Sequence, residues 1–112
     1  MCVKFHPNNR LIVACGKDKH VRVWDLRNNG LLHSFCEHVS VVTSVDCHRD
    51  GNMLCSSGLD GTVKLYNLKE NRILYTLHGH ETPVNCVQFS MDGNFLASGD
   101  QKGQIFRWRT NF

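Results

Sequence analysis

Hydrophobic and polar residues alternate in short runs along most of the chain, which is the period-2 pattern of β-strands. The middle of the chain shows it most clearly, with runs separated by polar turns at residues 41–47, 52–58, 62–68 and 73–77. Asp-Gly pairs stand in three of the turns along the chain, where glycine supplies the positive φ that tight hairpins need. No stretch has the periodicity of a long helix, so the pattern predicts an all-β fold of short antiparallel strands.

The same unit recurs every 42 residues without an insertion or deletion. Equivalent residues line up at this offset in four sets: Phe5, Cys47 and Phe89; Asp18, Asp60 and Lys102; Trp24, Tyr66 and Trp108; and His38 with His80. Four short strands in a unit of this length describe one blade of a β-propeller. We therefore predict one propeller domain with about two and two-thirds blades: a partial repeat at 1–35, a complete repeat at 36–77, and a repeat lacking its last strand at 78–112.

Two kinds of segment give the chain a family resemblance. HGHETPVNCVQFSMDGNFLASG resembles the first half of a WD40 repeat, while DKHVRVWDL and DGTVKLYNL resemble its second half. The resemblance covers essentially the full length and implies a sector of a WD40 β-propeller, a fragment of a larger ring. It also implies that a buried polar tetrad holds each blade together: a histidine before the first strand, a serine in the second, an aspartate in the next turn, and a tryptophan in the third strand.

The matching tetrad residues differ among the three copies. The second copy has His38, Ser56, Asp60 and Tyr66, in which the tyrosine departs from the usual tryptophan but still offers a hydroxyl donor. The third copy has His80, Ser98 and Trp108, but Lys102 stands where the aspartate is expected, so we expect that network to be broken. The first copy keeps Asp18 and Trp24 with Ala14 in place of the serine. Because buried polar groups need hydrogen-bond partners, these residues are interpreted as scaffold rather than as catalytic groups.

Other interpretations of the polar residues are weaker. His78 and His80 lie two residues apart on an extended chain and point to opposite sides, and nothing is spaced with Cys36 to complete a zinc site. The HRD at 48–50 resembles the start of a kinase catalytic loop, but Cys55 stands where the metal-binding asparagine is needed, so we interpret it as a hairpin turn. No nucleophile, base and orienting residue converge. We predict no enzyme activity, no metal and no cofactor.

Composition and charge narrow the class of protein. The chain has 112 residues, 41% hydrophobic and 21% charged, as in a soluble globular domain, with no run long enough to cross a membrane and no secretory signal. Its six cysteines are interpreted as small buried thiols in a reducing compartment rather than as a disulfide framework. The net charge of +3 is too small, and too interrupted by acidic residues, to indicate nucleic-acid binding.

Several basic residues are candidates for binding a partner protein. One hairpin carries Lys17, Lys19, His20 and Arg22, and Arg107 and Arg109 lie near the end of the chain. They could attract an acidic protein surface, or they could be ordinary solvated charges. Arg27 completes the sequence Trp-Asp-Leu-Arg at 24–27, which matches a short signature for docking the adaptor of cullin-type ubiquitin ligases.

A finer resemblance suggests a cellular role. RILYTLHGH and the ending FLASGDQKGQIFRWRTNF resemble the last blades of the centriolar proteome-of-centriole WD40 family. This resemblance implies a structural scaffold of the cytoplasmic cytoskeleton, in the microtubule walls of the centriole, basal body or cilium axoneme, that binds tubulin and neighbouring proteins. The alternative is a substrate receptor or adaptor of a ubiquitin ligase or signalling complex.

The predicted sector is not a closed ring. A blade buries both faces of its sheet against its neighbours, so fewer than three blades leave two apolar faces open. We expect the chain to be a C-terminal piece of a longer protein. A short chain that completes its ring by oligomerisation is the alternative.

Overall fold

The computed structural model describes residues 2–28 and 30–110, and the described residues form strands and turns with no helix. The strands are β1 Cys2–Phe5, β2 Leu11–Cys15, β3 Val21–Asp25, β4 Gly30–Phe35, β5 Val42–Cys47, β6 Met53–Gly58, β7 Val63–Asn67, β8 Arg72–Leu77, β9 Val84–Phe89, β10 Phe95–Asp100 and β11 Ile105–Arg109. The predicted all-β fold is confirmed, and the four strands expected in the middle of the chain begin and end within one residue of their predicted limits.

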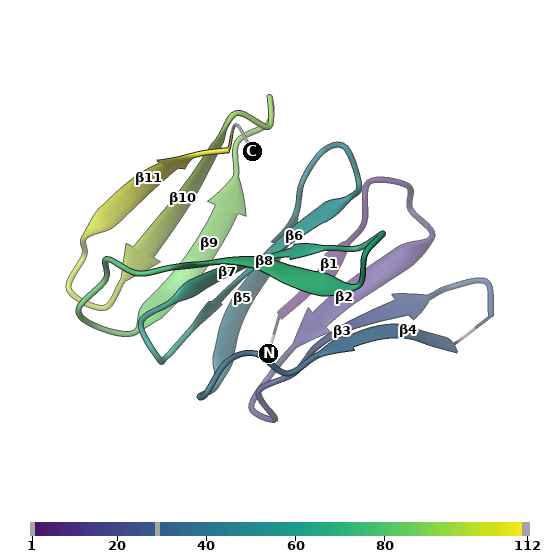
Figure 1. Ribbon diagram of the computed structural model, residues 1–112, viewed down its shortest axis with the longest axis horizontal. Helices are drawn as coiled ribbons and strands as arrows, with labels where there is room; N and C mark the ends of the chain where they lie inside the picture. The colour runs from purple at the N-terminus through teal and green to yellow at the C-terminus, as the bar shows by residue number, and fades with distance from the viewer. Residues whose placement is uncertain (1, 29, 111–112) are drawn as a thin grey trace.

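The strands form three antiparallel sheets in chain order. The first sheet is β1-β2-β3-β4, the second is β5-β6-β7-β8, and the third is β9-β10-β11. Figure 1 shows the three sheets side by side, with the second between the other two. Because consecutive antiparallel strands alternate in direction, successive turns lie at opposite ends of each sheet. None of the described segments is a helix that could cross a membrane.

Two hydrophobic clusters hold the sheets together. The first lies between sheets one and two and includes Val13, Val23, Val45 and Leu54. The second lies between sheets two and three, where it includes Leu65, which is fully buried. The middle sheet therefore has apolar side chains on both faces, as expected of a blade with a neighbour on each side.

Histidine side chains in the turn between the first two strands of a sheet form hydrogen bonds to the next sheet. His6 Nε2–H donates to the carbonyl of Gly51 at 2.6 Å, and His48 Nε2–H donates to the carbonyl of Gly93 at 2.9 Å. In each imidazole, Nδ1 accepts the backbone N–H two residues later, which fixes the neutral tautomer. Both glycines have φ near +79°, and a Cβ there would come within 2.8 Å of the histidine ring. Glycine is thus required both by the turn and by the close approach of the ring.

Replacing His48 by alanine is expected to lower the free energy of unfolding by about 1 kcal/mol, because the inter-sheet hydrogen bond is lost while the Thr110 hydroxyl still donates to the Gly93 carbonyl. Urea unfolding of the full-length protein measures the change. His78 is exposed, so His78→Ala is the matched control and should change stability by less than about 0.5 kcal/mol. Equal effects of the two substitutions would show that the inter-sheet hydrogen bond contributes nothing.

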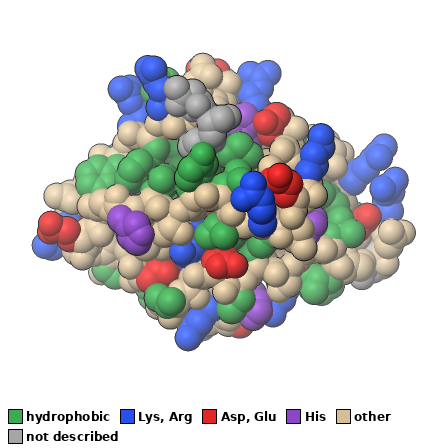
Figure 2. Space-filling view, in the orientation of Figure 1, with side chains coloured by type: hydrophobic (Ala, Val, Ile, Leu, Met, Phe, Trp, Pro, Cys, Tyr) green, Lys and Arg blue, Asp and Glu red, His purple; other side chains and the backbone are tan. Residues whose placement is uncertain are grey.

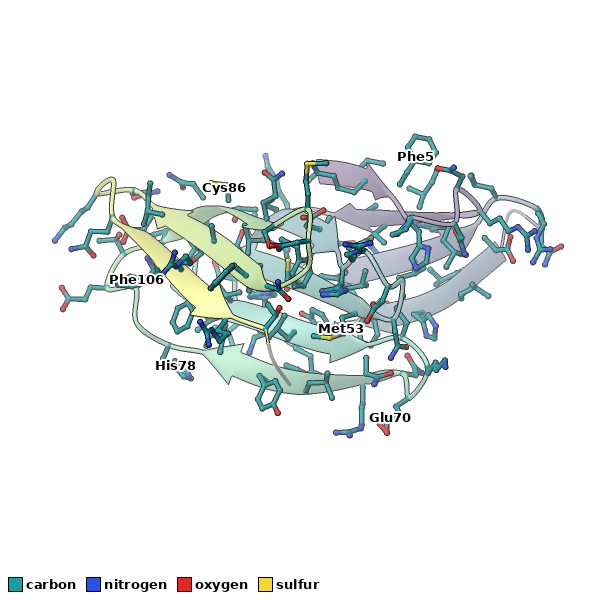
Figure 3. The ribbon with its side chains drawn as sticks, turned by 90° about the horizontal axis from the view of Figure 1, so that it is seen from above. Phe5, Met53, Glu70, His78, Cys86 and Phe106 are labelled. Atoms are coloured by element: carbon teal, nitrogen blue, oxygen red, sulfur yellow. The ribbon has the colours of Figure 1, made fainter. Side chains whose placement is uncertain are left out.

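The outward faces of the first and third sheets are open to solvent. Val3 is 62% exposed and Ile105 is 76% exposed, whereas their counterparts 42 residues away in the middle sheet, Val45 and Val63, are fully buried. Hydrophobic side chains gather over the third sheet in Figure 2. Figure 3 shows Phe5 of β1 at the upper edge of the molecule. The described residues therefore form an open sector of a propeller, as the repeat count predicts.

Candidate functional site

A buried polar chain runs through the second sheet. The His38 ring lies between the Asp60 carboxylate, 3.0 Å from Nδ1, and the Ser56 hydroxyl, 2.6 Å from Nε2. The Tyr66 hydroxyl lies 2.9 Å from Ser56 Oγ, and both side chains are fully buried. The structure thus brings together the four residues that the resemblance assigned to the tetrad of the second copy.

The donors and acceptors of this chain fit a neutral imidazole. Tyr66 O–H donates to Ser56 Oγ, the Ser56 O–H donates to His38 Nε2, and His38 Nδ1–H donates to Asp60. Burial lowers the pKa of His38, although the nearby Asp60 carboxylate opposes this shift. Burial would raise the pKa of Asp60, but hydrogen bonds from Thr62 and His38 outweigh it and hold this pKa below its usual value. A neutral histidine beside an ionised carboxylate satisfies every group in the chain.

The third sheet contains an equivalent network, so the expectation of a broken one is wrong. His80 Nε2 lies 2.7 Å from Ser98 Oγ, and Trp108 Nε1–H donates to the same oxygen at 3.0 Å. His80 Nδ1 lies 2.9 Å from a carboxylate oxygen of Asp100, two residues before Lys102. The hydrogen bond from His80 lowers the pKa of Asp100, and the Lys102 side chain is exposed. Asp100 therefore supplies the carboxylate that Lys102 cannot.

The position of Asp100 explains how it can replace an aspartate two residues later. At an offset of 42 residues, Asp100 corresponds to Gly58. A Cβ built on Gly58 would lie 2.6 Å from His38 Nδ1, so a side chain from this backbone position points directly at the imidazole. In the second sheet the space is filled by His38 and Asp60, and the backbone position must be glycine. In the third sheet the aspartate itself stands at that position.

The first sheet shows no such network among the described residues. Asp18 forms an ion pair with Arg22 and accepts the backbone N–H of His20, instead of meeting an imidazole. The pKa of Asp18 is lowered, chiefly by its hydrogen bond with Arg22. Trp24 is 39% exposed and lines a shallow pocket together with Asp18 and Ala14. The structure places Asp18 and Trp24 near one another but does not join them through a serine and a histidine.

The serine, histidine and aspartate of each network lie in the same order as in hydrolytic triads, yet the geometry cannot present a nucleophile. The Ser56 hydroxyl is fully buried and already accepts a hydrogen bond from Tyr66, and Ser98 is 2% exposed. A substrate carbonyl would have to reach these oxygens through packed sheets. No group of three His, Cys, Asp or Glu residues in the described ranges, 2–28 and 30–110, could hold a metal ion. These networks can stabilise blades and orient turns.

The lowered pKa of His38 predicts that the protein loses stability in acid. Unfolded histidine binds a proton near pH 6.5, whereas folded His38 resists protonation until the pH is lower. The contribution of His38 is therefore complete above pH 6.5 and is lost as the pH falls below it, with a slope of at most about 1.4 kcal/mol per pH unit.

Urea unfolding at a series of pH values, for the wild type and for His38→Gln, measures this slope. The glutamine variant cannot titrate at this position, so its stability should change less between about pH 7 and about pH 5. Identical slopes for both proteins would contradict the assignment of a neutral, buried imidazole.

Two of the basic candidates, Lys17 and Lys19, lie at the same end of the sheets as His38 and His80. Lys17 and Lys19 are exposed in the β2–β3 turn, and Lys19 has φ of 71°. Val39 and Leu59, 78% and 37% exposed, lie in the neighbouring β4–β5 loop and β6–β7 turn. Backbone hydrogen bonds join these segments, from Val42 N to Gly16 O and from Leu59 N to Val41 O. We call Lys17, Lys19, Val39 and Leu59 the lysine–valine patch.

The other basic candidates are dispersed or engaged. His20 Nδ1 lies 3.1 Å from Ser34 Oγ, and Arg22 pairs with Asp18. Arg107 and Arg109 lie on β11, in the third sheet, with guanidinium carbons 4.7 and 5.7 Å from the centre of the Phe95 ring. Figure 1 shows β11 and the first sheet on opposite sides of the molecule, so these arginines do not extend the lysine–valine patch.

Sequence reasoning missed the polar ties between sheets. Besides the two turn histidines, Thr43 Oγ1–H donates to the carbonyl of Val84 at 2.6 Å, and Asp46 accepts the backbone N–H of Phe89 at 2.8 Å. His78, which the sequence set apart from His80, is exposed and lies beside β8, at the edge opposite Phe5 in Figure 3. The repeated histidine of the first hairpin, at 6 and 48, was the one available signal for these contacts.

The family described as "WD domain, G-beta repeat" matches residues 1–25, 29–67 and 71–109, which is most of the chain. This chain belongs to the WD40 repeat family. A solved structure entitled "Structure of U3-55K" superposes with a TM-score of 0.92 over 97% of this chain and 35% of that chain, at 22% identity, and supports the WD40 fold. WD40 repeats imply a scaffold for protein interactions, which fits the closed, buried networks inside the blades.

Several curated relatives match part of the chain. Nuclear distribution protein PAC1 of Komagataella phaffii is 43% identical over 51 residues, and an F-box protein of Saccharomyces cerevisiae is 39% identical over 44 residues. These alignments cover 45% and 39% of this chain, but only 10% and 7% of the two relatives. The chain thus spans a small part of the proteins that it resembles.

Proposed function

We propose that this WD40 chain is a non-enzymatic structural scaffold that binds tubulin and neighbouring proteins in the microtubule walls of centrioles, basal bodies or axonemes. The observation that carries the proposal is the lysine–valine patch, which combines two exposed ammonium groups with two exposed apolar side chains. The identity of the partner comes from the resemblance of RILYTLHGH and the ending FLASGDQKGQIFRWRTNF to the proteome-of-centriole family. Of that ending, residues 111–112 lie outside the described residues.

The patch suits an acidic protein surface because its own acids are largely engaged. Asp18, between the two lysines, is neutralised by Arg22, and Asp60 accepts hydrogen bonds from His38 and Thr62. Glu37 is exposed beside Val39 and limits the positive charge of the patch. Attraction should therefore be local and weaken as salt is added.

Co-sedimentation of the full-length protein with microtubules tests the proposal. The double substitution Lys17→Glu with Lys19→Glu is expected to weaken binding roughly tenfold or more at low salt. The control Lys4→Glu with Lys69→Glu makes the same change of net charge at exposed residues outside the patch and should bind nearly as the wild type does. No binding by the wild type, or an equal loss in both variants, would overturn the proposal.

A second candidate, an adaptor of a ubiquitin ligase, is favoured by the Trp-Asp-Leu-Arg sequence and by the relative named an F-box protein. The Arg27 side chain is 64% exposed, and its Nε lies 3.8 Å from the buried carboxylate of Asp25. Arg27 follows β3 and lies at the end of the sheet opposite the lysine–valine patch. Loss of ligase-adaptor binding in Arg27→Ala, with no microtubule association in the wild type, would favour this candidate over the scaffold.

A further inference from the structure

Two of the six cysteines face each other across adjacent strands. Cys2 of β1 and Cys15 of β2 are direct partners in the antiparallel register. In the strand pairings of residues 2–28 and 30–110, no other cysteine is opposite a cysteine: Cys47 faces Leu54, and Cys86 faces Gly99. No disulfide joins any of the six thiols.

The register brings the two side chains within reach of a covalent bond. Directly opposite residues of an antiparallel pair have Cα atoms about 4.5–5.5 Å apart, inside the range of roughly 4.4–6.8 Å that disulfides span. Both side chains are on the face that packs on the second sheet, with Cys15 in the first hydrophobic cluster and Cys2 against it. We propose that Cys2 and Cys15 are a redox-sensitive pair that forms a disulfide across β1 and β2 on exposure to hydrogen peroxide.

The surroundings assign different roles to the two sulfurs. Cys2 is only half-buried, so peroxide can reach it, whereas Cys15 is 7% exposed. Burial, with a smaller contribution from Cys2, raises the pKa of Cys15 to about 11, so Cys15 is a poor first nucleophile. Cys2 is therefore the thiol that reacts with the oxidant, and Cys15 is the resolving thiol.

The chemistry proceeds in two balanced steps. The Cys2 thiolate attacks one oxygen of hydrogen peroxide, the O–O bond breaks, and the departing hydroxide takes up the thiol's proton, leaving a sulfenic acid and one water. The Cys15 sulfur then attacks the Cys2 sulfur, its proton leaves with the displaced hydroxide as a second water, and the S–S bond forms. The two sulfurs are oxidised together by two electrons, which reduce the peroxide.

The other cysteines provide contrasts within the same chain. Cys36 and Cys86 are exposed, which corrects the expectation that every cysteine is a buried thiol. They should react with peroxide or an alkylating reagent without forming an intramolecular link. Burial raises the pKa of Cys47 to about 12 and also raises that of the fully buried Cys55, so both should react slowly.

Peptide mapping of the oxidised, full-length protein tests the pair. The reduced protein is treated with hydrogen peroxide, its remaining thiols are blocked with iodoacetamide, and it is digested with trypsin without reduction. We expect the major linked species to join the peptide that contains Cys2 to residues 11–17, and dithiothreitol to separate them. Cys2→Ser and Cys15→Ser should each abolish this species, whereas Cys86→Ser should leave its yield unchanged.

Oxidation of the urea-unfolded protein distinguishes pairing by structure from pairing by chance. In an unfolded chain the shortest loop between two cysteines is the one that joins Cys47 to Cys55. Because short loops close most readily, the yield of the Cys47–Cys55 link should rise and that of the Cys2–Cys15 link should fall. The proposal is overturned if the native protein yields no link between Cys2 and Cys15 while Cys86 is oxidised. It is equally overturned if the native and unfolded proteins give the same distribution of links.

Discussion

Replacing Asp100 by alanine is expected to lower the melting temperature of the full-length protein by about 10 °C, because removal of one member of a buried hydrogen-bonded pair leaves the other without a partner. The Asp100 carboxylate accepts a hydrogen bond from His80 on one oxygen. Its other oxygen accepts the backbone N–H groups of Lys102 and Gln104, so the β10–β11 turn would lose its support as well. Thermal unfolding followed by circular dichroism measures the change.

Lys102→Ala is the matched control for Asp100→Ala. Lys102 is the residue that the 42-residue repeat aligns with Asp60, but its side chain is exposed. The melting temperature of this variant should stay within about 2 °C of the wild type. A large loss in Lys102→Ala with none in Asp100→Ala would reverse the assignment of the carboxylate in the third network.

The substitution Leu65→Ala is expected to reduce the free energy of unfolding by about 3 kcal/mol, through lost burial and the cavity that remains. Leu65 is fully buried in the cluster that joins the second and third sheets, near Val84 and Leu96. The reduction would therefore report on contact between blades rather than on one sheet alone. Urea unfolding of the full-length protein gives this quantity directly.

Leu32→Ala provides the comparison for this cavity. Leu32 lies on β4 and is 48% exposed, so the same truncation there should cost less than about 1 kcal/mol. Similar losses at the two leucines would mean that the sheets do not pack against each other through the second cluster.

The fold could be predicted from the sequence because strand alternation and the 42-residue repeat are both local and periodic. The run 62–68 alternates between two faces, and it forms β7 with Leu65 on the face toward the third sheet. The repeat then places equivalent strands in each unit. The two open faces also followed from the repeat count, since a blade without a neighbour exposes what the middle blade buries.

The third network could not be predicted in full because alignment at a fixed offset compares backbone positions rather than the space that side chains reach. Asp100 starts two residues before the expected position, yet its carboxylate occupies the place next to His80 Nδ1 that Asp60 takes next to His38. The close approach of the imidazole to the Gly58 position is visible only in three dimensions. For the same reason the sequence could not show which basic residues share a surface. The two basic stretches, at 17–22 and 107–109, lie in different sheets.

The measurement that tests the central claim most directly is super-resolution imaging of the tagged, full-length protein in dividing or ciliated cells. The proposed scaffold predicts signal confined to centriole, basal-body or axoneme walls, and this signal should survive detergent extraction. The Lys17→Glu, Lys19→Glu variant should lose wall signal, while the Lys4→Glu, Lys69→Glu control should retain it. Diffuse signal that washes out of the cells would contradict the account and direct attention to Arg27 and a ligase adaptor.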